Sequence, residues 1–421
     1  TYEYIGTFHF GITMLPGGVV DPHILWKLDH AVRTMERCGL KWLCFNDDLR
    51  RHLDADGVEG HPYWHANGGA ARCLEDFYSH PAVLKLQERR LTHMISRFAD
   101  SPALWIWNCG DESECQPGMK RSKAMVRQWL KHLHRFIRNH DVYEHAHAIG
   151  ECKEAVSLGS DVVVLEDWYY DWAWPSQSRD HVWLYEHRKD DVLANEGILA
   201  RYQDLACPVI NSEGGHGLVG FIADPPHGHN ATLSNPAIDR YSDVSFHIHL
   251  WISLFKQCAA GGTNWLCNAM DRHHQLFHAG SIGRYIAGEP LTEGPWKSGT
   301  PRTLDERLYG FTLLSPSEER ILLWLTDRAY SMHNMILSGG VIEPVTGATL
   351  SLMLSGGTWE IEWWNTFEGK RIGVESLSAN PGKTRGAFEV QIALPSFTKD
   401  IAAKLTRKNS PPPAPDKSGI R

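Results

Sequence analysis

Two glutamates follow directly on apolar, strand-like segments of the chain. Glu112 comes after "ALWIWNCGD" and Glu213 after "CPVINS". If both segments are parallel strands of one barrel, their exits meet at the same mouth. A protonated carboxyl facing an ionised one across a cleft is the pair that cleaves glycosidic bonds. A single glutamate at a strand end is, taken alone, more simply explained as a solvated loop acid or as the partner of an arginine; it is the pair on one barrel that favours catalysis.

Other polar residues lie close to predicted strand exits. Asn46 closes the segment 40–46 and could bind sugar hydroxyls or cap the next helix. His147 and His216 lie at or just beyond strand ends, where they could orient the carboxylates or be structural. Trp168 and Tyr169 open an aromatic loop in a chain with 17 tryptophans, which favours stacking on sugar rings or packing of the loop itself.

The composition and motifs predict no metal ion and no cofactor. The histidine-rich runs "PPHGHN" and "DRHHQLFH" lack the HExxH arrangement, and the nine cysteines contain no CxxC pair. No glycine-rich phosphate loop is found. A net charge of −8 argues against nucleic acid as the partner, and no apolar run reaches the roughly 20 residues that cross a bilayer. The expected partner is a carbohydrate substrate, without nucleic acid or membrane.

Strand-like and helix-like segments alternate over the first 300 residues. Helical spacing predicts helices near 22–39, 81–99, 120–139, 190–205 and 240–259, with short apolar strands at 40–46, 103–108, 143–150, 160–168, 207–215 and 261–271. This order is typical of a parallel sheet with helical crossovers, and long strand-to-helix loops favour a (β/α)8 TIM barrel over 1–300. The opening "TYEYIGTFHFGI" supplies one more strand, so an early strand is missing and the N-terminus is expected to be incomplete.

The pattern changes near residue 305. Short, partly alternating runs separated by Gly, Asn, Pro and Ser predict a small all-β sandwich over 305–400; they are "RLYGFTLLS", "RILLWLTD", "TWEIEWWNT", "RIGVES" and "AFEVQIALP". The proline-rich end, 406–421, is predicted to be a disordered tail.

Several of these segments together resemble clan A glycoside hydrolases. "SPALWIWNCGDES" resembles the clan's fourth-strand signature, "CPVINSEGG" its seventh-strand pattern, and residues 66–102 a Gly-Gly loop and long helix of its cellulase-like and apiosidase-like members. "TWEIEWWNTFEGKRI" resembles an element of the small β-sandwich that follows such barrels. The resemblance implies that Glu112 is the general acid/base, Glu213 the nucleophile and Trp265 the floor of the subsite beside the cleaved bond, where a core tryptophan is the alternative.

The chain departs from the clan pattern at two acidic positions. The clan carries Asn before the acid/base, and this chain carries Asp111. An ionised carboxylate only accepts hydrogen bonds, so Asp111 favours a strongly donating substrate group such as the 2-ammonium of a glucosamine unit. Alternatively, Asp111 accepts from a hydroxyl or pairs with a histidine. Glu166 stands where relatives often carry His, so it is either a third cleft acid or a sign of shifted register.

The sequence therefore predicts a retaining glycoside hydrolase that cleaves a β-linked oligo- or polysaccharide by double displacement. Two alternatives remain open: a β-glucosaminidase-type specificity set by Asp111, and a non-catalytic or truncated carbohydrate-binding barrel. An extracellular or periplasmic location is the expectation, because polymer-degrading enzymes are often exported.

Overall fold

The computed structural model describes most of the chain, namely residues 14–15, 19–45, 61–110, 117–149, 155–166, 190–200, 202, 204–205, 207–213, 236–263, 271, 273–379 and 386–408. The described chain mixes helices and strands, as predicted, and divides into two compact units: residues 1–166 with 204–212, and residues 167–203 with 213–421. The predicted barrel and the predicted boundaries near 300 and 405 stay predictions. Among the described helices, none combines the length and apolar character that crossing a bilayer requires.

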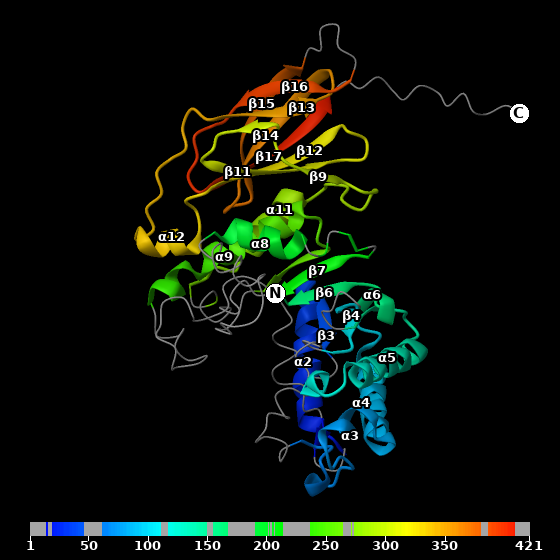
Figure 1. Ribbon diagram of the computed structural model, residues 1–421. Coiled ribbons are helices and arrows are strands. Elements are labelled where there is room, and N and C mark those ends of the chain that lie inside the picture. The colour runs from blue at the N-terminus through cyan, green and yellow to red at the C-terminus, as the bar shows by residue number, and fades with distance from the viewer. Residues whose placement is uncertain are drawn as a thin grey trace, which may run out of the picture. The chain divides into compact units, whose positions relative to one another are not determined.

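The first unit alternates helices with short strands, shown in blue to green in Figure 1. Its elements are β1 (Met14–Leu15), β2 (Val19–Val20), α2 (Pro22–Cys38), β3 (Trp42–Phe45), α3 (Leu74–Ser79), α4 (Pro81–Phe98), β4 (Leu104–Asn108), α5 (Lys123–His140), β5 (Ala146–Ala148), α6 (Ala155–Leu158), β6 (Val163–Glu166) and β7 (Val209–Glu213), with 3₁₀ turns at His65–Asn67 and Pro117–Lys120. Glu213 itself is assigned to the second unit.

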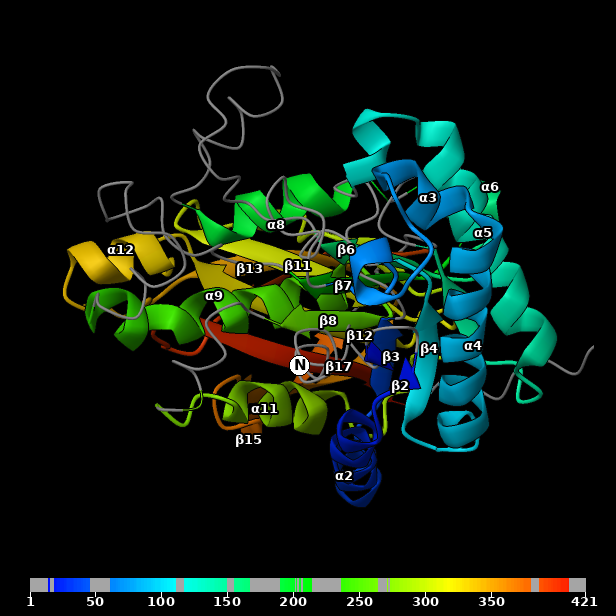
Figure 2. The ribbon, with the colours of Figure 1, turned by 90° about the horizontal axis from the view of Figure 1, so that it is seen from below.

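Strands β3, β4 and β5 form a parallel sheet in that order. Trp42 pairs with Leu104, and Trp107 pairs with His147. The long helices α4 and α5 contact each other and lie beside β4 in Figure 2, as expected for crossover connections between parallel strands. Strand β6 lies next to β7 in a separate sheet, where the N–H of Val163 donates to the carbonyl of Pro208 at 2.9 Å.

The long helices begin and end where the sequence predicts. Asp21 caps α2 by accepting from the N–H groups of His23 and Ile24, and Pro22 occupies the first helical position. The helix ends at Gly39, which adopts the left-handed conformation (φ 66°) and donates back to the last turn. Ser122 caps α5 in the same way as Asp21 caps α2, through the N–H of Met125.

Helix α5 buries one apolar stripe against the sheet. Val126, Leu130, Leu133 and Ile137 are all fully buried and recur at helical spacing. Complete burial of a Val, Leu or Ile side chain stabilises a fold by about 1.5–3 kcal/mol. This stripe fixes α5 over β4 and β5, the strands that lead toward the predicted acid/base.

The second unit contains helices and two antiparallel sheets, shown in green to red in Figure 1. Its elements are α8 (Asp191–Ala200), α9 (Pro236–Phe255), β8 (Ala260–Thr263), α11 (Phe277–Ile286), β9 (Lys297–Gly299), β10 (Thr303–Leu304), β11 (Leu308–Leu314), β12 (Arg320–Asp327), α12 (Met332–Leu337), β13 (Thr349–Leu354), β14 (Gly357–Asn365), β15 (Lys370–Ala379), β16 (Phe388–Ala393) and β17 (Asp400–Lys408).

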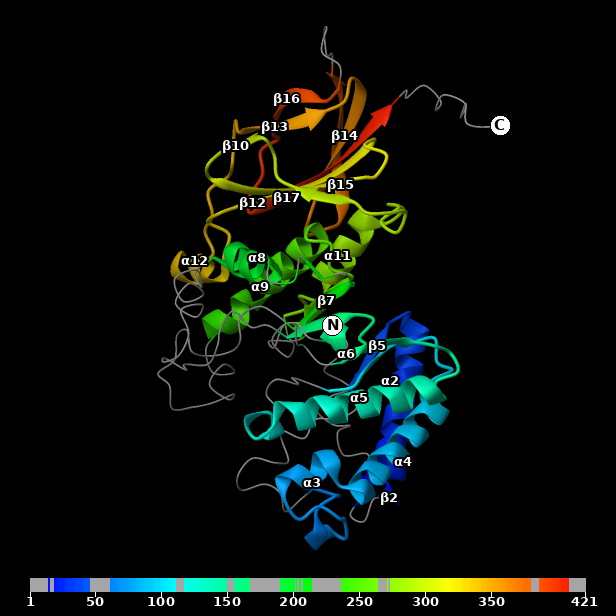
Figure 3. The same ribbon diagram turned by 45° about the vertical axis from the view of Figure 1, so that its right-hand side comes forward.

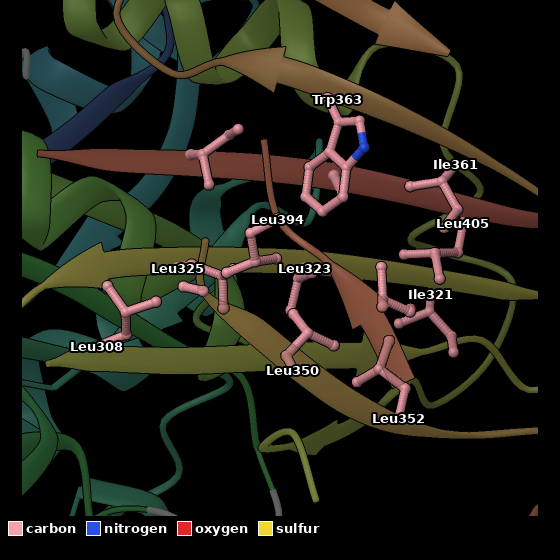
Figure 4. Packing of buried hydrophobic residues seen from close by; sticks show 14 of the residues in the cluster. Leu308, Ile321, Leu323, Leu325, Leu350, Leu352, Ile361, Trp363, Leu394 and Leu405 are labelled. Carbon is pink, nitrogen blue, oxygen red and sulfur yellow. The ribbon is translucent and has the colours of Figure 1, made fainter. Parts of the chain in front are cut away.

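The strands after residue 296 form two sheets that share one hydrophobic core. The larger sheet has the order β15-β14-β17-β12-β11-β9 and the smaller the order β10-β13-β16. Figure 4 shows side chains of both sheets meeting in this core, among them Leu323 and Leu405 from the larger sheet and Leu350 and Leu352 from the smaller. These leucines are at most 4% exposed, so the two sheets are held together by a dry interface.

The opposite face of the larger sheet packs on helices. Trp324 of β12 is completely buried and stacks on Trp251 and Phe255 of α9, with ring centroids 5.9 and 6.3 Å apart. The hydroxyl of Tyr285 on α11 donates to the carbonyl of Ala403 at 2.8 Å. Figure 3 shows α8, α9 and α11 grouped on this side of the sheets. Strand β12 is therefore buried on both faces, which explains its continuous apolar run "ILLWL".

Candidate functional site

The end of strand β4 is firmly anchored up to the residue before Asp111. Trp107 and Asn108 are completely buried, and the N–H of Cys109 donates to the carbonyl of Ala148 at 2.9 Å. The Asn108 side chain accepts from the N–H of Gly110 at 3.3 Å. The main chain therefore enters the Asp111-Glu112 segment from a fixed point.

Two other strands, β6 and β7, each have a glutamate as their last residue. Glu166 is the last residue of β6, and Glu213 is the last residue of β7. In β7 the preceding residues Ile210 and Asn211 are 3% and 1% exposed. Glu166 and Glu213 thus each close a strand whose preceding residues are buried.

Most of the predicted site residues lie outside the described part of the chain. They are Asn46, Asp111, Glu112, Trp168, Tyr169, His216 and Trp265, while Glu166 and Glu213 are described only in their main chain. Asn46 directly follows β3, and Trp265 comes two residues after β8. Their predicted roles stay predictions.

His147 is the predicted site residue whose side chain the structure does describe. It lies in the middle of β5, is 1% exposed, and its ring meets that of His134 edge-on, with centroids 4.9 Å apart. Burial, together with the positive charges of His134 and Arg138, lowers the pKa of His147 to about 4. The imidazole is therefore neutral at physiological pH and packs beneath α5. Its predicted contact with substrate stays a prediction.

A cluster that the sequence analysis did not consider surrounds His147. Cys109 and His134 join it, and one ligand-type atom from each of the three residues lies within 4.8 Å of the others. The signal in the sequence was His134 itself, because it falls on the apolar stripe of α5 between Leu130 and Ile137. A polar residue on a buried helical face requires a partner.

Known proteins similar to this chain include fungal enzymes that act on mannan. A probable mannan endo-1,4-beta-mannosidase A-2 of Aspergillus terreus is 30% identical over 140 residues, which is 33% of this chain and 33% of the relative. The mannan endo-1,4-beta-mannosidase A of Aspergillus aculeatus is 26% identical over 137 residues, or 32% of this chain and 34% of the relative. The chain thus matches about a third of the length of these relatives. No family model matches the chain.

Solved structures with a more distant likeness are also carbohydrate-active enzymes by their names. GH5_18 from Streptomyces cattleya, in complex with GlcNAc, has a TM-score of 0.40 and 15% identity, covering 59% of this chain and 57% of that chain. Endo-glycoceramidase II from Rhodococcus sp. has a TM-score of 0.36 and 12% identity, covering 93% of this chain and 86% of that chain. The curated relatives confirm that this chain resembles glycoside hydrolases, as its strand-end motifs predicted.

Proposed function

We propose that this chain is a retaining glycoside hydrolase that cleaves a β-linked oligo- or polysaccharide. In this proposal a (β/α)8 barrel carries the site and a small β-sandwich follows it. Support comes from the parallel order β3-β4-β5 with helices between consecutive strands, and from the two antiparallel sheets after residue 296. The similarity to mannan endo-1,4-beta-mannosidases supports the reaction class.

Glu213 and Glu112 carry the chemistry in this proposal. The Glu213 carboxylate attacks the anomeric carbon while the Glu112 carboxyl gives its proton to the departing glycosidic oxygen, so one C–O bond forms as another breaks. The Glu112 carboxylate then takes a proton from water, and the resulting attack on the glycosyl ester releases Glu213 and the sugar. The observation that carries the assignment is that Glu213 closes β7 while Asp111-Glu112 follow the anchored end of β4.

The sugar is a finer part of the proposal. The names of the curated relatives make a β-1,4-mannan the first polymer to test. Asp111 makes a polymer of 2-amino sugars the second substrate to test. A carboxylate beside the acid/base would accept a hydrogen bond from a 2-ammonium group and favour the protonated form of Glu112. Activity on chitosan oligomers above that on mannan would assign the specificity to Asp111.

The test is hydrolysis of β-mannan, chitosan oligomers and a panel of aryl β-glycosides, including the glucosaminide. The variants are Glu213→Ala and Glu112→Ala, with Glu166→Ala as the matched strand-end control. We expect Glu213→Ala to abolish turnover, and azide to restore part of the Glu112→Ala activity with a β-glycosyl azide as the product. Loss of turnover in Glu166→Ala, with full activity in Glu213→Ala, would reassign the nucleophile. Binding of the oligosaccharides without turnover by the folded wild type would instead favour the non-catalytic carbohydrate-binding barrel.

A further inference from the structure

The cluster of Cys109, His134 and His147 lies between strands β4 and β5 and helix α5. Cys109 directly follows β4, His147 is in β5 opposite Trp107, and His134 projects from the buried face of α5. Trp107 points toward α5, since its indole N–H donates to the carboxylate of Asp141 just past the end of that helix at 3.0 Å. Cys109, two residues further along, points to the same side.

The three side chains offer metal-ligand atoms to one enclosed space. Cys109 is completely buried, His147 is 1% exposed and His134 is 9% exposed. One ligand atom from each lies within 4.8 Å of the other two. The two imidazole rings are perpendicular, with an interplanar angle of 87°, so that they do not stack. The side chains thus converge from three separate elements of the first unit.

One ring nitrogen of each of the two histidines lacks a protein partner. The Nδ1 atoms of His134 and His147 are buried, and neither has a hydrogen-bond partner among the residues that the structure describes. Leaving a buried polar atom unpaired costs about 1–3 kcal/mol, and such atoms are uncommon in folded proteins. Two such atoms, one on each of two imidazoles that meet edge-on beside a buried thiol, point to a missing group that accepts electron pairs from nitrogen and sulfur.

We propose that Cys109, His134 and His147 bind a Zn²⁺ ion. One thiolate and two imidazoles are ligands that Zn²⁺ takes in proteins, whereas Mg²⁺ and Ca²⁺ require oxygen. Zn–N and Zn–S bonds hold ligand atoms about 3.3–3.7 Å apart in tetrahedral geometry. The three atoms, which spread over as much as 4.8 Å, therefore draw together by about 1 Å when the ion enters. The Cys109 thiol releases its proton as the Zn–S bond forms.

The ion would tie together the elements that support the predicted acid/base. It would join α5, β5 and the residue after β4, three positions before Glu112. The three protein ligands leave the fourth tetrahedral position of the ion open to a water molecule. Binding of the ion does not depend on the proposed hydrolase activity. Metal binding to the folded state also raises stability by mass action.

The test is metal binding to the full chain, stripped with a chelator and titrated with Zn²⁺, Cu⁺, Mg²⁺ and Co²⁺. We expect one Zn²⁺ per chain, a raised Tm, no shift with Mg²⁺, and a thiolate-to-metal charge-transfer band with Co²⁺. Cys109→Ser is expected to remove the band, and His134→Gln or His147→Gln to weaken Zn²⁺ binding by more than about 100-fold. Cys44→Ser is the matched control, because Cys44 is an equally buried thiol on the neighbouring strand β3, and it is expected to keep the band.

Other outcomes would overturn the proposal. Zn²⁺ binding that survives both Cys109→Ser and His147→Gln would belong to other histidines of the chain. If the charge-transfer band were lost in Cys44→Ser but kept in Cys109→Ser, the metal-binding thiol would be Cys44 and not Cys109. If the chain bound Cu⁺ but not Zn²⁺, the proposed ion would be wrong. Folding of each variant is checked by near-ultraviolet circular dichroism in the chelated state. No binding to the folded wild type would refute the site without any variant.

Discussion

A buried carboxylate, Asp400, provides the sharpest test of how the second unit is held together. Asp400 begins β17 and accepts hydrogen bonds from three different elements: from Nε2 of His247 at 2.7 Å, from the indole of Trp324 at 2.8 Å and from the hydroxyl of Thr366 at 2.6 Å. On its other side, Nδ1 of His247 lies 2.9 Å from Nδ1 of His278. The side chains of His247 and His278 are completely inaccessible to solvent.

Hydrogen-bond geometry fixes the number of protons on the two imidazoles. Nε2 of His247 faces a carboxylate, and Nε2 of His278 faces the carboxylate of Asp243 at 3.4 Å, so both nitrogens carry hydrogen. One further proton lies between the two Nδ1 atoms. Three protons on two imidazoles amount to one positive charge. Burial lowers the pKa of His278 to about 4. From the contacts of His247 with Asp400 and His278, we predict that the positive charge lies on His247.

The perturbation is Asp400→Asn, which keeps the shape of the side chain and removes its charge. The amide oxygen can still accept from His247 and Trp324, and the hydroxyl of Thr366 can turn to accept from the amide N–H. What remains is a buried imidazolium without its counter-charge. Removing one partner of a buried ion pair costs about 3–5 kcal/mol, and because the hydrogen bonds are preserved we expect a loss of about 3 kcal/mol.

The assay is equilibrium unfolding in urea at pH 7, combined with hydrogen exchange of peptides covering β17 and α9. Exchange is needed because a chain with two compact units need not unfold in one step. The matched control is Lys408→Gln, which breaks the exposed pair between Lys408 and Glu360 at the other end of the same strand. Exposed pairs contribute about 0–1 kcal/mol, so the control should leave the exchange of β17 nearly unchanged.

A double-mutant cycle decides whether the loss comes from the ion pair. If His247 is charged, adding His247→Gln to Asp400→Asn should cost much less than His247→Gln in the wild type, because the partner has already gone. Asp400→Asn within about 1 kcal/mol of the wild type, or strictly additive effects, would refute a charged His247 and leave a neutral hydrogen-bond network in its place.

Three further predictions concern a buried glutamine, a glycine at a helix end and a buried histidine. Gln87→Leu should destabilise the first unit by about 2–4 kcal/mol in urea unfolding, because it leaves the Trp129 indole N–H and the Phe77 carbonyl unpaired in the core. A loss below about 1 kcal/mol would show that these two hydrogen bonds do not stabilise the unit as argued. Gly39→Ala should cost about 1 kcal/mol of stability through its φ of 66° alone, since a Cβ there meets nothing within 4 Å, and Gly39→Asn should recover part of it. The stability of the second unit should fall by about 3 kcal/mol as the pH drops from 6.5 toward 4, because the unfolded chain binds a proton that folded His278, with its lowered pKa, does not. Hydrogen exchange of second-unit peptides isolates this effect from that of His147 in the first unit, whose pKa is also lowered to about 4. His278→Gln should flatten the profile of the second unit, and an unchanged profile would disprove the assignment.

Local sequence signals predicted the helices of the first unit well. The predicted helix at 22–39 corresponds to α2, and the one at 81–99 to α4, because caps, a proline at the first position and apolar periodicity all agree there. The same signals fail for α11, whose sequence contains two glycines, which disfavour helices. It forms because tertiary packing buries His278, Ser281 and Tyr285.

Strand β17 was missed for a related reason. Its start, "DIAAK", is rich in residues that disfavour strands, and no turn signal sets it apart. In the sheet it lies between β14 and β12, where Ile401, Ala403 and Leu405 enter the core between the sheets. Its small alanines fit because both neighbours carry large side chains. Such a strand is recognisable only once its partners are known.

In the candidate site, too, the features that depend on local sequence were predictable and the contacts between distant residues were not. The position of Glu213 at the end of β7 follows from a contiguous apolar run, which a sequence displays directly. The same holds for the end of β4 at Asn108, four residues before Glu112 in the sequence. The His247, His278 and Asp400 network joins groups as much as 153 residues apart, and nothing local marks them as partners. The same holds for Cys109, His134 and His147.

Four of the chain's 24 histidines lie in the two buried clusters, one in each unit. In each unit, a buried imidazole on a helix meets groups on or next to the strands of a sheet: His134 of α5 meets His147 of β5 and Cys109 just after β4, and His247 of α9 meets Asp400 at the start of β17. Burying imidazoles costs free energy unless each nitrogen finds a partner. In the second unit Asp400 and His278 supply the partners. In the first unit the described protein groups leave both Nδ1 atoms unpaired, which is why a metal ion, rather than another carboxylate, is the partner that this cluster requires.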